Sequence, residues 1–251
     1  NESYVLWQWL LGDSATTGST TSPAGSLAST SIVADAGHFS VMTYTGSGAN
    51  ATVGHGLGAA PTMVLIKNLE TAENWLAWHE GLTSAQYFLN LNTTGAEFDN
   101  GASGYFRGTA PNATVITMND SSYNTSSRDY IAYCFKSVAG VCKVGTYEGN
   151  NNANGTYVNL GFTPAFFMAK NIDATGSWFI IDNKRGFNSA SNEAYLQAES
   201  TATETVGNVA DLLSDGVKWR TTGGGNASNT FIYIAMADIG GNGTLPPVYS
   251  K

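Results

Sequence analysis

Apolar and polar residues alternate in short segments along most of the chain. Residues 39–44 follow a period of two, so the odd-numbered side chains would lie on one face of a strand and the even-numbered ones on the other. The runs at 62–67 and 165–170 are apolar up to a final lysine. They are too short for a helix and too apolar for an exposed strand, which predicts two buried strands.

The same reasoning extends over the rest of the sequence. We expect further strands at 75–79, 87–91, 114–118, 130–135, 157–162, 178–182, 194–197, 217–220 and 231–236. Val209–Leu213 is either a strand that ends in a two-residue turn at Asp215-Gly216 or a single helical turn. Elsewhere no segment sustains a period of 3.6. Many short strands separated by Gly, Asn and Ser turns predict an all-β protein of the β-sandwich, jelly-roll or lectin-like kind.

Several sequence segments occur twice in the chain at a constant spacing. The segment TYTG at 43–46 returns 103 positions later as TYEG at 146–149, and Lys67 and Trp75 return at the same offset as Lys170 and Trp178. Two internal repeats of about 100 residues indicate tandem modules, each long enough to bury its own core.

The ends of the repeats predict the domain boundaries. Tyr130–Phe135 returns as Phe231–Met236, and Tyr4–Trp9 resembles the same closing strand. We therefore expect a closing strand of a preceding module at 1–11, a Ser/Thr/Gly-rich linker at 12–36, β-sandwich modules at 37–138 and 139–239, and a C-terminal tail at 240–251.

Composition narrows the class of partner. Charged residues make up 12% of the chain, about half of the usual 25%. The net charge is −8 and no cluster of Lys and Arg occurs, which argues against a nucleic-acid surface. No apolar run approaches the length of a membrane-spanning helix, so we expect no membrane insertion.

Cys134 and Cys142 could form a local disulfide, but Ala235 replaces Cys134 in the second copy, which favours free, half-buried thiols.

Aromatic side chains are the best candidates for ligand contacts. The candidate ligand-binding residues are Trp75, Trp78, His79, Tyr87, Trp178 and Trp219. Each Lys–Trp pair, Lys67 with Trp75 and Lys170 with Trp178, is either a sugar-binding platform or the packing of a hairpin. Because both copies have the pair at the same offset of 103 positions, hairpin packing is favoured for these positions.

Residues with catalytic or metal-binding patterns are not found. His38, His55 and His79 lack the spacing of a zinc pair. The alignment at offset 103 places Val158 opposite His55, which favours a solvated turn histidine there. Glu97 and Glu204 give one acid per module rather than the facing pair of a glycosidase. We therefore predict that the protein is not an enzyme.

Two oxygen-rich loops, 119–129 and 150–154, could hold Ca²⁺, but neither has the spacing of a dedicated calcium loop. We therefore expect no cofactor and no metal site.

Several longer phrases resemble a known group of proteins. They are YIAYCF at 130–135, KVGTYEG at 143–149, LGFTPAFFMAKN at 160–171, SWFIIDN at 177–183 and NASNTFIYIAMA at 226–237. As a set they resemble the repeated C-terminal modules of tail-fibre and appendage proteins of tailed bacteriophages, especially marine ones. The resemblance covers about 37–239 and implies a virion surface protein, often trimeric, without catalytic residues. The chain departs from the pattern after Ala237, where a more apolar ending is expected.

These observations lead to one functional prediction and one alternative. We predict a virion appendage protein on the particle surface that attaches to host cell-surface glycan and contacts other virion proteins as a homo-oligomer, with a trimer favoured. The alternative is a purely structural virion protein, a capsid decoration or a fibre shaft, with no receptor binding.

Overall fold

The computed structural model describes residues 20–22, 24–34, 36–120, 122–185 and 194–238. Within these residues every regular element is a strand and every strand pairing is antiparallel, which confirms the all-β class. The predicted closing strand at 1–11 and the tail at 240–251 lie outside the described residues.

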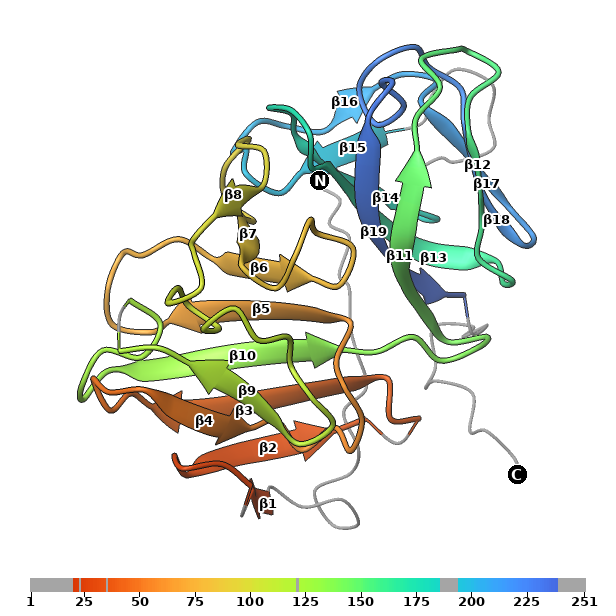
Figure 1. Ribbon diagram of the computed structural model, residues 1–251. Coiled ribbons are helices and arrows are strands. Elements are labelled where there is room, and N and C mark those ends of the chain that lie inside the picture. Colours follow the sequence, from red (N-terminus) through yellow and green to blue (C-terminus); the bar gives the residue numbers. More distant parts are fainter. Residues whose placement is uncertain (1–19, 23, 35, 121, 186–193, 239–251) are drawn as a thin grey trace.

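The strands are β1 Thr20–Ser22, β2 Ser29–Val33, β3 Phe39–Thr45, β4 Ala51–Gly54, β5 Met63–Asn68, β6 Leu76–His79, β7 Tyr87–Asn90, β8 Phe98–Asp99, β9 Val115–Met118, β10 Asp129–Phe135, β11 Cys142–Glu148, β12 Tyr157–Asn159, β13 Pro164–Asn171, β14 Trp178–Asp182, β15 Ala194–Gln197, β16 Thr205–Val206, β17 Ala210–Leu213, β18 Gly216–Trp219 and β19 Thr230–Ala237. They form two large and two small sheets (Figure 1).

Sheet 1 has the strand order β1-β2-β3-β10-β5-β6-β7-β8, and sheet 2 has the order β11-β19-β13-β14-β15-β16. From β3 in sheet 1 and β11 in sheet 2 onward, the two orders match strand for strand. Small sheet 1 (β4-β9) lies over one face of sheet 1, and small sheet 2 (β12-β18-β17) belongs with sheet 2 (Figure 1). We call residues 20–135 the first half and residues 142–238 the second half.

Each half buries apolar side chains between its large and its small sheet. In the second half, Phe167 of β13 and Trp219 of β18 are fully buried with their rings 6.2 Å apart. In the first half, Tyr44 and Tyr130 stack 5.1 Å apart in the core that Val53 of β4 completes. Alternation along each strand directs these side chains to the inner face of the sheet.

Two predictions about local structure are wrong. Residues 29–33, placed in a linker, form β2, because the hydroxyl of Ser29 donates to the Gly54 carbonyl at 2.6 Å and the small Ser31 packs inside the sheet. The turn between β17 and β18 lies at residues 214–215, since Leu213 pairs with Gly216. Ala210–Leu213 is therefore a strand and not a helical turn.

The two halves meet through the outer faces of sheets 1 and 2. A cavity of about 160 Å³ at this junction is lined only by apolar residues, namely Met63, Leu65, Leu91, Phe135, Phe166, Met168, Ile180, Ala198, Ile234 and Met236. Leu91 follows the β7 residue Asn90, and Ala198 follows the matching β15 residue Gln197. The cavity therefore exists partly because alanine stands in the second half where the first half has leucine.

We expect Ala198→Leu to stabilise the protein. Three added carbons in an apolar cavity would raise the free energy of unfolding by about 1–2 kcal/mol, allowing for imperfect packing. Thermal and urea unfolding would measure the change, with exposed Ala202→Leu as the control that should bring no gain. A destabilised Ala198→Leu variant would contradict the open cavity.

Candidate functional site

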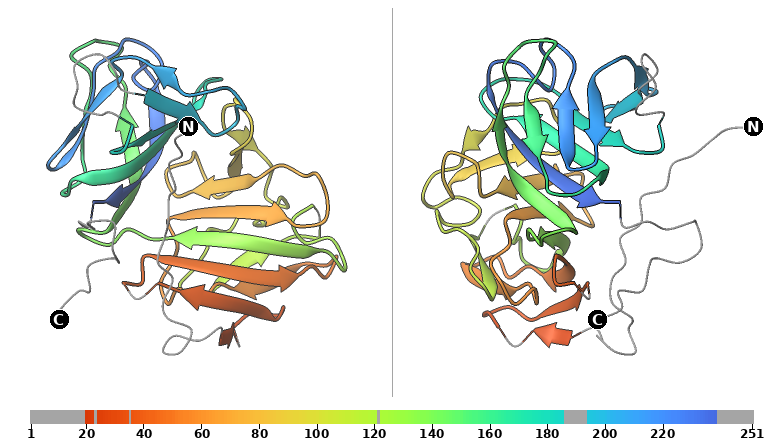
Figure 2. Two further views of the ribbon diagram at one scale, coloured as in Figure 1. Left: turned by 180° about the vertical axis from the view of Figure 1, so that it is seen from behind. Right: turned by 90° about the vertical axis from the view of Figure 1, so that its right-hand side faces the viewer.

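Among the residues that the structure describes, those of the second half cover the outer face of sheet 1 at one end only. Phe135 and Met63, next to the second half, are buried. Two positions back along β10, Tyr133 is half-buried, and at the far end Thr43 and Asp129 are exposed. From behind the molecule, no described strand lies in front of β2, β3 and β10 (Figure 2). We call this uncovered part of sheet 1 the open face.

The exposed end of the open face is a shallow depression of about 410 Å³. It is lined by Ala28, Ser29, Thr30, Thr43, Tyr44, Thr45, Leu69, Asp129 and Tyr130. Strand pairing sets Thr30 beside Thr43 and Thr45 beside Asp129. The Thr45 hydroxyl donates a hydrogen bond to the Asp129 carboxylate at 2.7 Å, which holds that carboxylate in the depression.

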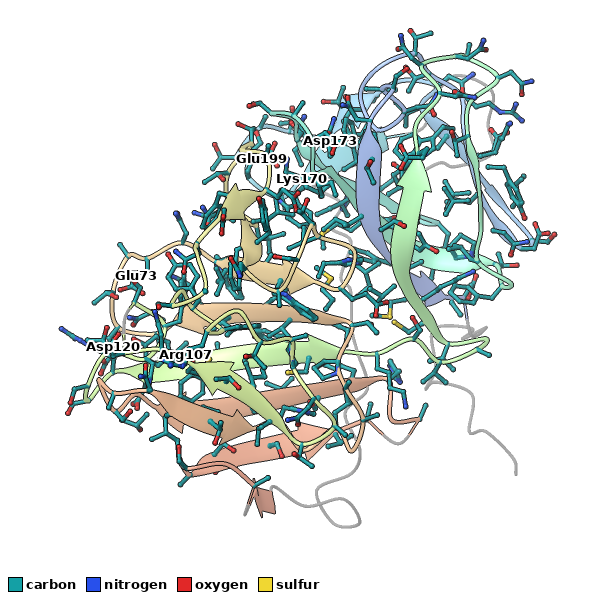
Figure 3. The ribbon with its side chains drawn as sticks, in the orientation of Figure 1. Glu73, Arg107, Asp120, Lys170, Asp173 and Glu199 are labelled. Atoms are coloured by element: carbon teal, nitrogen blue, oxygen red, sulfur yellow. The ribbon has the colours of Figure 1, made fainter. Side chains whose placement is uncertain are left out.

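An aromatic pair lies on the same face of sheet 1 as the depression. Trp75, immediately before β6, and Tyr133 of β10 are both half-buried, with ring centroids 6.0 Å apart. Lys67 lies on the same face, because β10 pairs Ile131 with Lys67 and Tyr133 with Leu65. Its ammonium donates to the Glu73 carbonyl at 2.5 Å, at the end of the sheet where Figure 3 labels Glu73.

The open face has the groups that a neutral, hydroxyl-rich ligand requires. Threonine hydroxyls both donate and accept hydrogen bonds, and an exposed carboxylate accepts two or more. The exposed Leu69 and the half-buried rings of Trp75 and Tyr133 offer apolar contact to the C–H face of a sugar ring. The geometry therefore suits shallow binding rather than an enclosed reaction site.

Four of the six predicted ligand residues are wrong. Trp78, His79, Trp178 and Trp219 are each at most 4% exposed, so they cannot contact a ligand at the surface. Trp78 faces the inner side of sheet 1, because it pairs with Val64 and lies next to Ala77, which pairs with the outward-facing Leu65.

The remaining two candidates are half-buried but separated. Trp75 lies beside Tyr133, whereas Tyr87 lies on β7 at the outer edge of the sheet, paired with Asp99 of β8. Of the six candidates, the structure therefore places only Trp75 on the open face.

Two histidines are buried, and the prediction of a solvated turn at His55 is wrong. His55 is fully buried and its Nε2 lies 3.0 Å from the Asn112 carbonyl. His79 accepts a hydrogen bond at Nδ1 from the Gly81 N–H (2.8 Å), and its Nε2 lies 3.3 Å from the Tyr233 carbonyl in the second half. Burial lowers the pKa of His55, and it lowers the pKa of His79 to about 4.

The second lysine–tryptophan pair is part of the junction. Lys170 is fully buried, and its ammonium donates to the carbonyls of Asn171 (2.9 Å) and of Thr94 (3.2 Å) across the junction. Burial lowers the pKa of Lys170 to about 8. The negative charge of Glu199 opposes this shift, and Figure 3 labels the two residues close together. Trp178 also bonds across the junction, from its indole N–H to the Asn90 carbonyl at 3.1 Å. A sugar platform at this pair is therefore wrong, and its role is packing.

The two acids considered for a glycosidase have structural partners. Glu97 accepts hydrogen bonds from the backbone N–H and the hydroxyl of Thr83, and Glu204 lies 3.7 Å from Arg185. The prediction that the protein is not an enzyme stays a prediction.

The loop considered for calcium in the first half is organised by a buried asparagine. Asn124 donates from Nδ2 to the carbonyls of Ala49 (2.6 Å) and Asn119 (2.7 Å), and its Oδ1 accepts from the Ser47 N–H at 2.9 Å. The amide thereby satisfies backbone groups of two loops from within the core.

Asn226 does the same in the second half. Its Nδ2 donates to the carbonyls of Asn152 (2.9 Å) and Thr221 (2.8 Å), and its Oδ1 accepts from the Asn150 N–H at 3.3 Å. Among the described residues, no three His, Cys, Asp or Glu side chains gather in a way that could hold a metal ion. The absence of a cofactor stays a prediction.

Cys134 and Cys142 are free, as predicted, but both are buried rather than half-buried. Burial raises the pKa of each thiol to about 12, so neither is reactive near neutral pH.

Sequence reasoning missed the residues of the depression. In the sequence, Thr43 and Thr45 stand out only as parts of a strand and of the repeated TYTG segment, and Asp129 only as the end of an oxygen-rich loop. A signal did exist, because the two threonines flank the inward-facing Tyr44 and must face outward together.

The DUF7483 family model, described as a domain of unknown function, matches residues 1–239. The chain belongs to this family. The match to DUF7483 extends over both halves and both large sheets. No curated protein and no solved structure matches the chain. In the part of the chain that the structure describes, no helix is long and apolar enough to cross a membrane.

Proposed function

We propose that this chain is a surface protein of a tailed-bacteriophage virion, an appendage of the tail-fibre kind, and that it attaches to host cell-surface glycan through the open face of sheet 1. The observation that carries this proposal is the exposed depression of threonines and Asp129, with the half-buried Trp75 and Tyr133 on the same face of sheet 1. The phrases that resemble phage appendage modules are the support for a virion location.

The proposal includes two tandem β-sandwich modules. In support, Tyr44 donates from its hydroxyl to the Tyr123 carbonyl at 2.6 Å, and Tyr147 donates to the Gly225 carbonyl at the same distance. The buried amides of Asn124 and Asn226 add matching contacts. A repeated scaffold with the same internal bonds is typical of module arrays, which present binding surfaces rather than active sites.

Affinity at such a shallow surface comes from several copies. Each site would bind weakly, and a homo-oligomer, with a trimer favoured, would multiply the contacts on a polysaccharide. Other virion proteins are the remaining partners, and no nucleic acid, membrane, metal or cofactor takes part in the proposed function.

Binding of the purified chain to intact bacteria and to their extracted surface polysaccharides tests the proposal. We expect Trp75→Ala and Asp129→Asn each to weaken binding at least tenfold, about 1.4 kcal/mol per site. Tyr157→Ala and Asp215→Asn, at exposed positions of the second half, are the matched controls and should bind normally. Equal binding by all four folded variants would rule out the open face.

A purely structural virion protein is the second candidate. The burial of Trp78, Trp178 and Trp219 favours it, because most of the aromatic surface that sequence suggested for ligands is used in packing. Labelling of virions distinguishes the two functions. A decoration protein would lie on the capsid lattice, whereas a receptor binder would lie at the distal end of a fibre.

A further inference from the structure

The junction cavity offers no hydrogen-bonding group to a ligand. Its ten lining residues are Met, Leu, Phe, Ile and Ala, and no polar atom forms part of its surface. A buried water needs about two to four polar partners, and a polar ligand group placed there would lose its hydrogen bonds to water without replacement. A molecule bound in this cavity must therefore be apolar.

The size of the cavity fits one small molecule. Its volume is about 160 Å³. An engineered cavity of about 150 Å³ in another protein, lined by Leu, Ile and Phe, binds benzene or xenon. The junction cavity has nearly the same volume and the same kind of wall. It can therefore accept a single aromatic ring or a hydrocarbon of similar size.

Methionine side chains make this wall adaptable. Three of the five methionines of the chain, Met63, Met168 and Met236, line the cavity. The other two, Met42 and Met118, lie in the core of the first half. An unbranched thioether side chain changes its shape at little cost, and its sulfur makes favourable contacts with aromatic rings. The wall can thus adjust to an aromatic ligand better than a wall of branched side chains.

The cavity comes nearest to solvent between Leu91 and Ala198. These two lining residues are half-buried, whereas the other eight are buried. Both lie just after a strand rather than within one, Leu91 after β7 and Ala198 after β15. A small molecule can therefore enter between these side chains without separating the paired strands of either sheet.

We propose that the junction cavity is a binding site for one small apolar molecule, an aromatic ring or a hydrocarbon of about the size of benzene. Four lining residues belong to the first half and six to the second, so the bound molecule contacts both halves at once. It binds only when the halves are packed together, and it therefore stabilises the junction by mass action. The cavity lies at the covered end of sheet 1, away from the depression, so the bound molecule leaves the proposed glycan surface free.

A titration of the full chain with benzene, followed by the methyl NMR signals of the methionines, tests the proposal. We expect saturable shifts at Met63, Met168 and Met236, because an aromatic ring changes the magnetic field at nearby methyl groups. Met42 and Met118 are the internal controls and should not shift. Phenol has nearly the same size, but its hydroxyl would be buried without a partner, so it should bind about tenfold more weakly or worse. Equal affinity for phenol, or a titration that leaves the three cavity methionines unchanged, would overturn the proposal.

Variants of Ala198 locate the site independently. Ala198→Leu places three carbons in the cavity, so we expect its affinity for benzene to fall about tenfold or more. Exposed Ala202→Leu is the control and should bind benzene like the parent protein. If Ala198→Leu fails to fold, Ala198→Val takes its place and should show a smaller loss of affinity.

Melting temperatures report whether the bound molecule stabilises the fold. Near saturation, benzene should raise the melting temperature of the parent protein and of Ala202→Leu by about 2–4 °C. The rise should be less than about 1 °C for Ala198→Leu, because its cavity is filled. A folded Ala198 variant that binds benzene as tightly as the parent protein would place the site elsewhere and overturn the proposal.

Discussion

Replacing Asn226 with alanine is expected to lower the free energy of unfolding by about 4 kcal/mol. The residue is fully buried, and its Nδ2 donates to Asn152, to Thr221 and to the Asn150 side chain at 2.8–2.9 Å. Its Oδ1 also accepts from the Thr156 N–H at 3.2 Å. Alanine would leave several buried backbone groups without partners, and each such group costs about 1–3 kcal/mol.

Urea unfolding measures this change, and the same loop offers a control. Asn154 is exposed, so Asn154→Ala should change stability by less than about 0.5 kcal/mol. Asn124→Ala should repeat the large loss in the first half, because its amide makes matching bonds. If Asn226→Ala unfolded at the same urea concentration as the parent protein, the loops would not depend on this amide.

The strands were predictable because alternation reports directly on the two faces of a strand. Met63–Asn68 and Pro164–Asn171, for example, lie within a residue or two of the predicted 62–67 and 165–170. Period-two patterning requires only that one face be buried, and that requirement is local. The hydroxylated strand β2 was missed because its buried residues, Ser29 and Ser31, are not apolar.

The candidate site was less predictable because burial depends on what covers a face. Trp75 and Trp178 occupy matching positions, yet Trp178 is 1% exposed whereas Trp75 is half-buried. The difference comes from the end of β7 and the segment after it, where Asn90 and Thr94 contact the second half. No property of either tryptophan in the sequence distinguishes the two cases.

Comparison of the two copies also failed where their lengths differ. At the offset of 103, Val158 stands opposite His55. In the structure Val158 pairs with Val217 as Val53 pairs with Ile116, so Val158 matches Val53 instead. An insertion in one loop shifted the comparison, and His55 was judged a surface residue although it is fully buried.

Acid is expected to destabilise the protein through His79. The Gly81 N–H donates to Nδ1, so this nitrogen carries no proton, and Nε2–H donates to the Tyr233 carbonyl of the second half. A second proton would have to be placed on Nδ1 against the Gly81 N–H, in a site that is 1% exposed. Burial accordingly lowers the pKa of His79 from 6.5 to about 4.

The sign and size of the effect follow from proton linkage. Between pH 6.5 and about 4 the unfolded chain binds a proton at this histidine that the folded chain does not. The stabilisation from His79 is therefore complete above pH 6.5 and is lost as the pH falls toward 4, a change of about 3 kcal/mol. Because His79 bonds to Tyr233, the loss weakens the junction between the halves.

Urea unfolding at pH 7.5, 6.0, 5.0 and 4.0 isolates this contribution by comparison with His79→Gln. Glutamine has a donor and an acceptor but does not titrate, so the stability of the variant should vary less with pH, and the gap to the parent protein should narrow toward pH 4. Burial also lowers the pKa of His38, a half-buried residue, and His38→Gln should keep most of the pH dependence. A His79→Gln variant with the full slope of the parent would place the acid sensitivity elsewhere, for example at the buried His55, whose pKa burial also lowers. Loss of the slope in that variant alone would identify the junction as the part of the fold that acid weakens first.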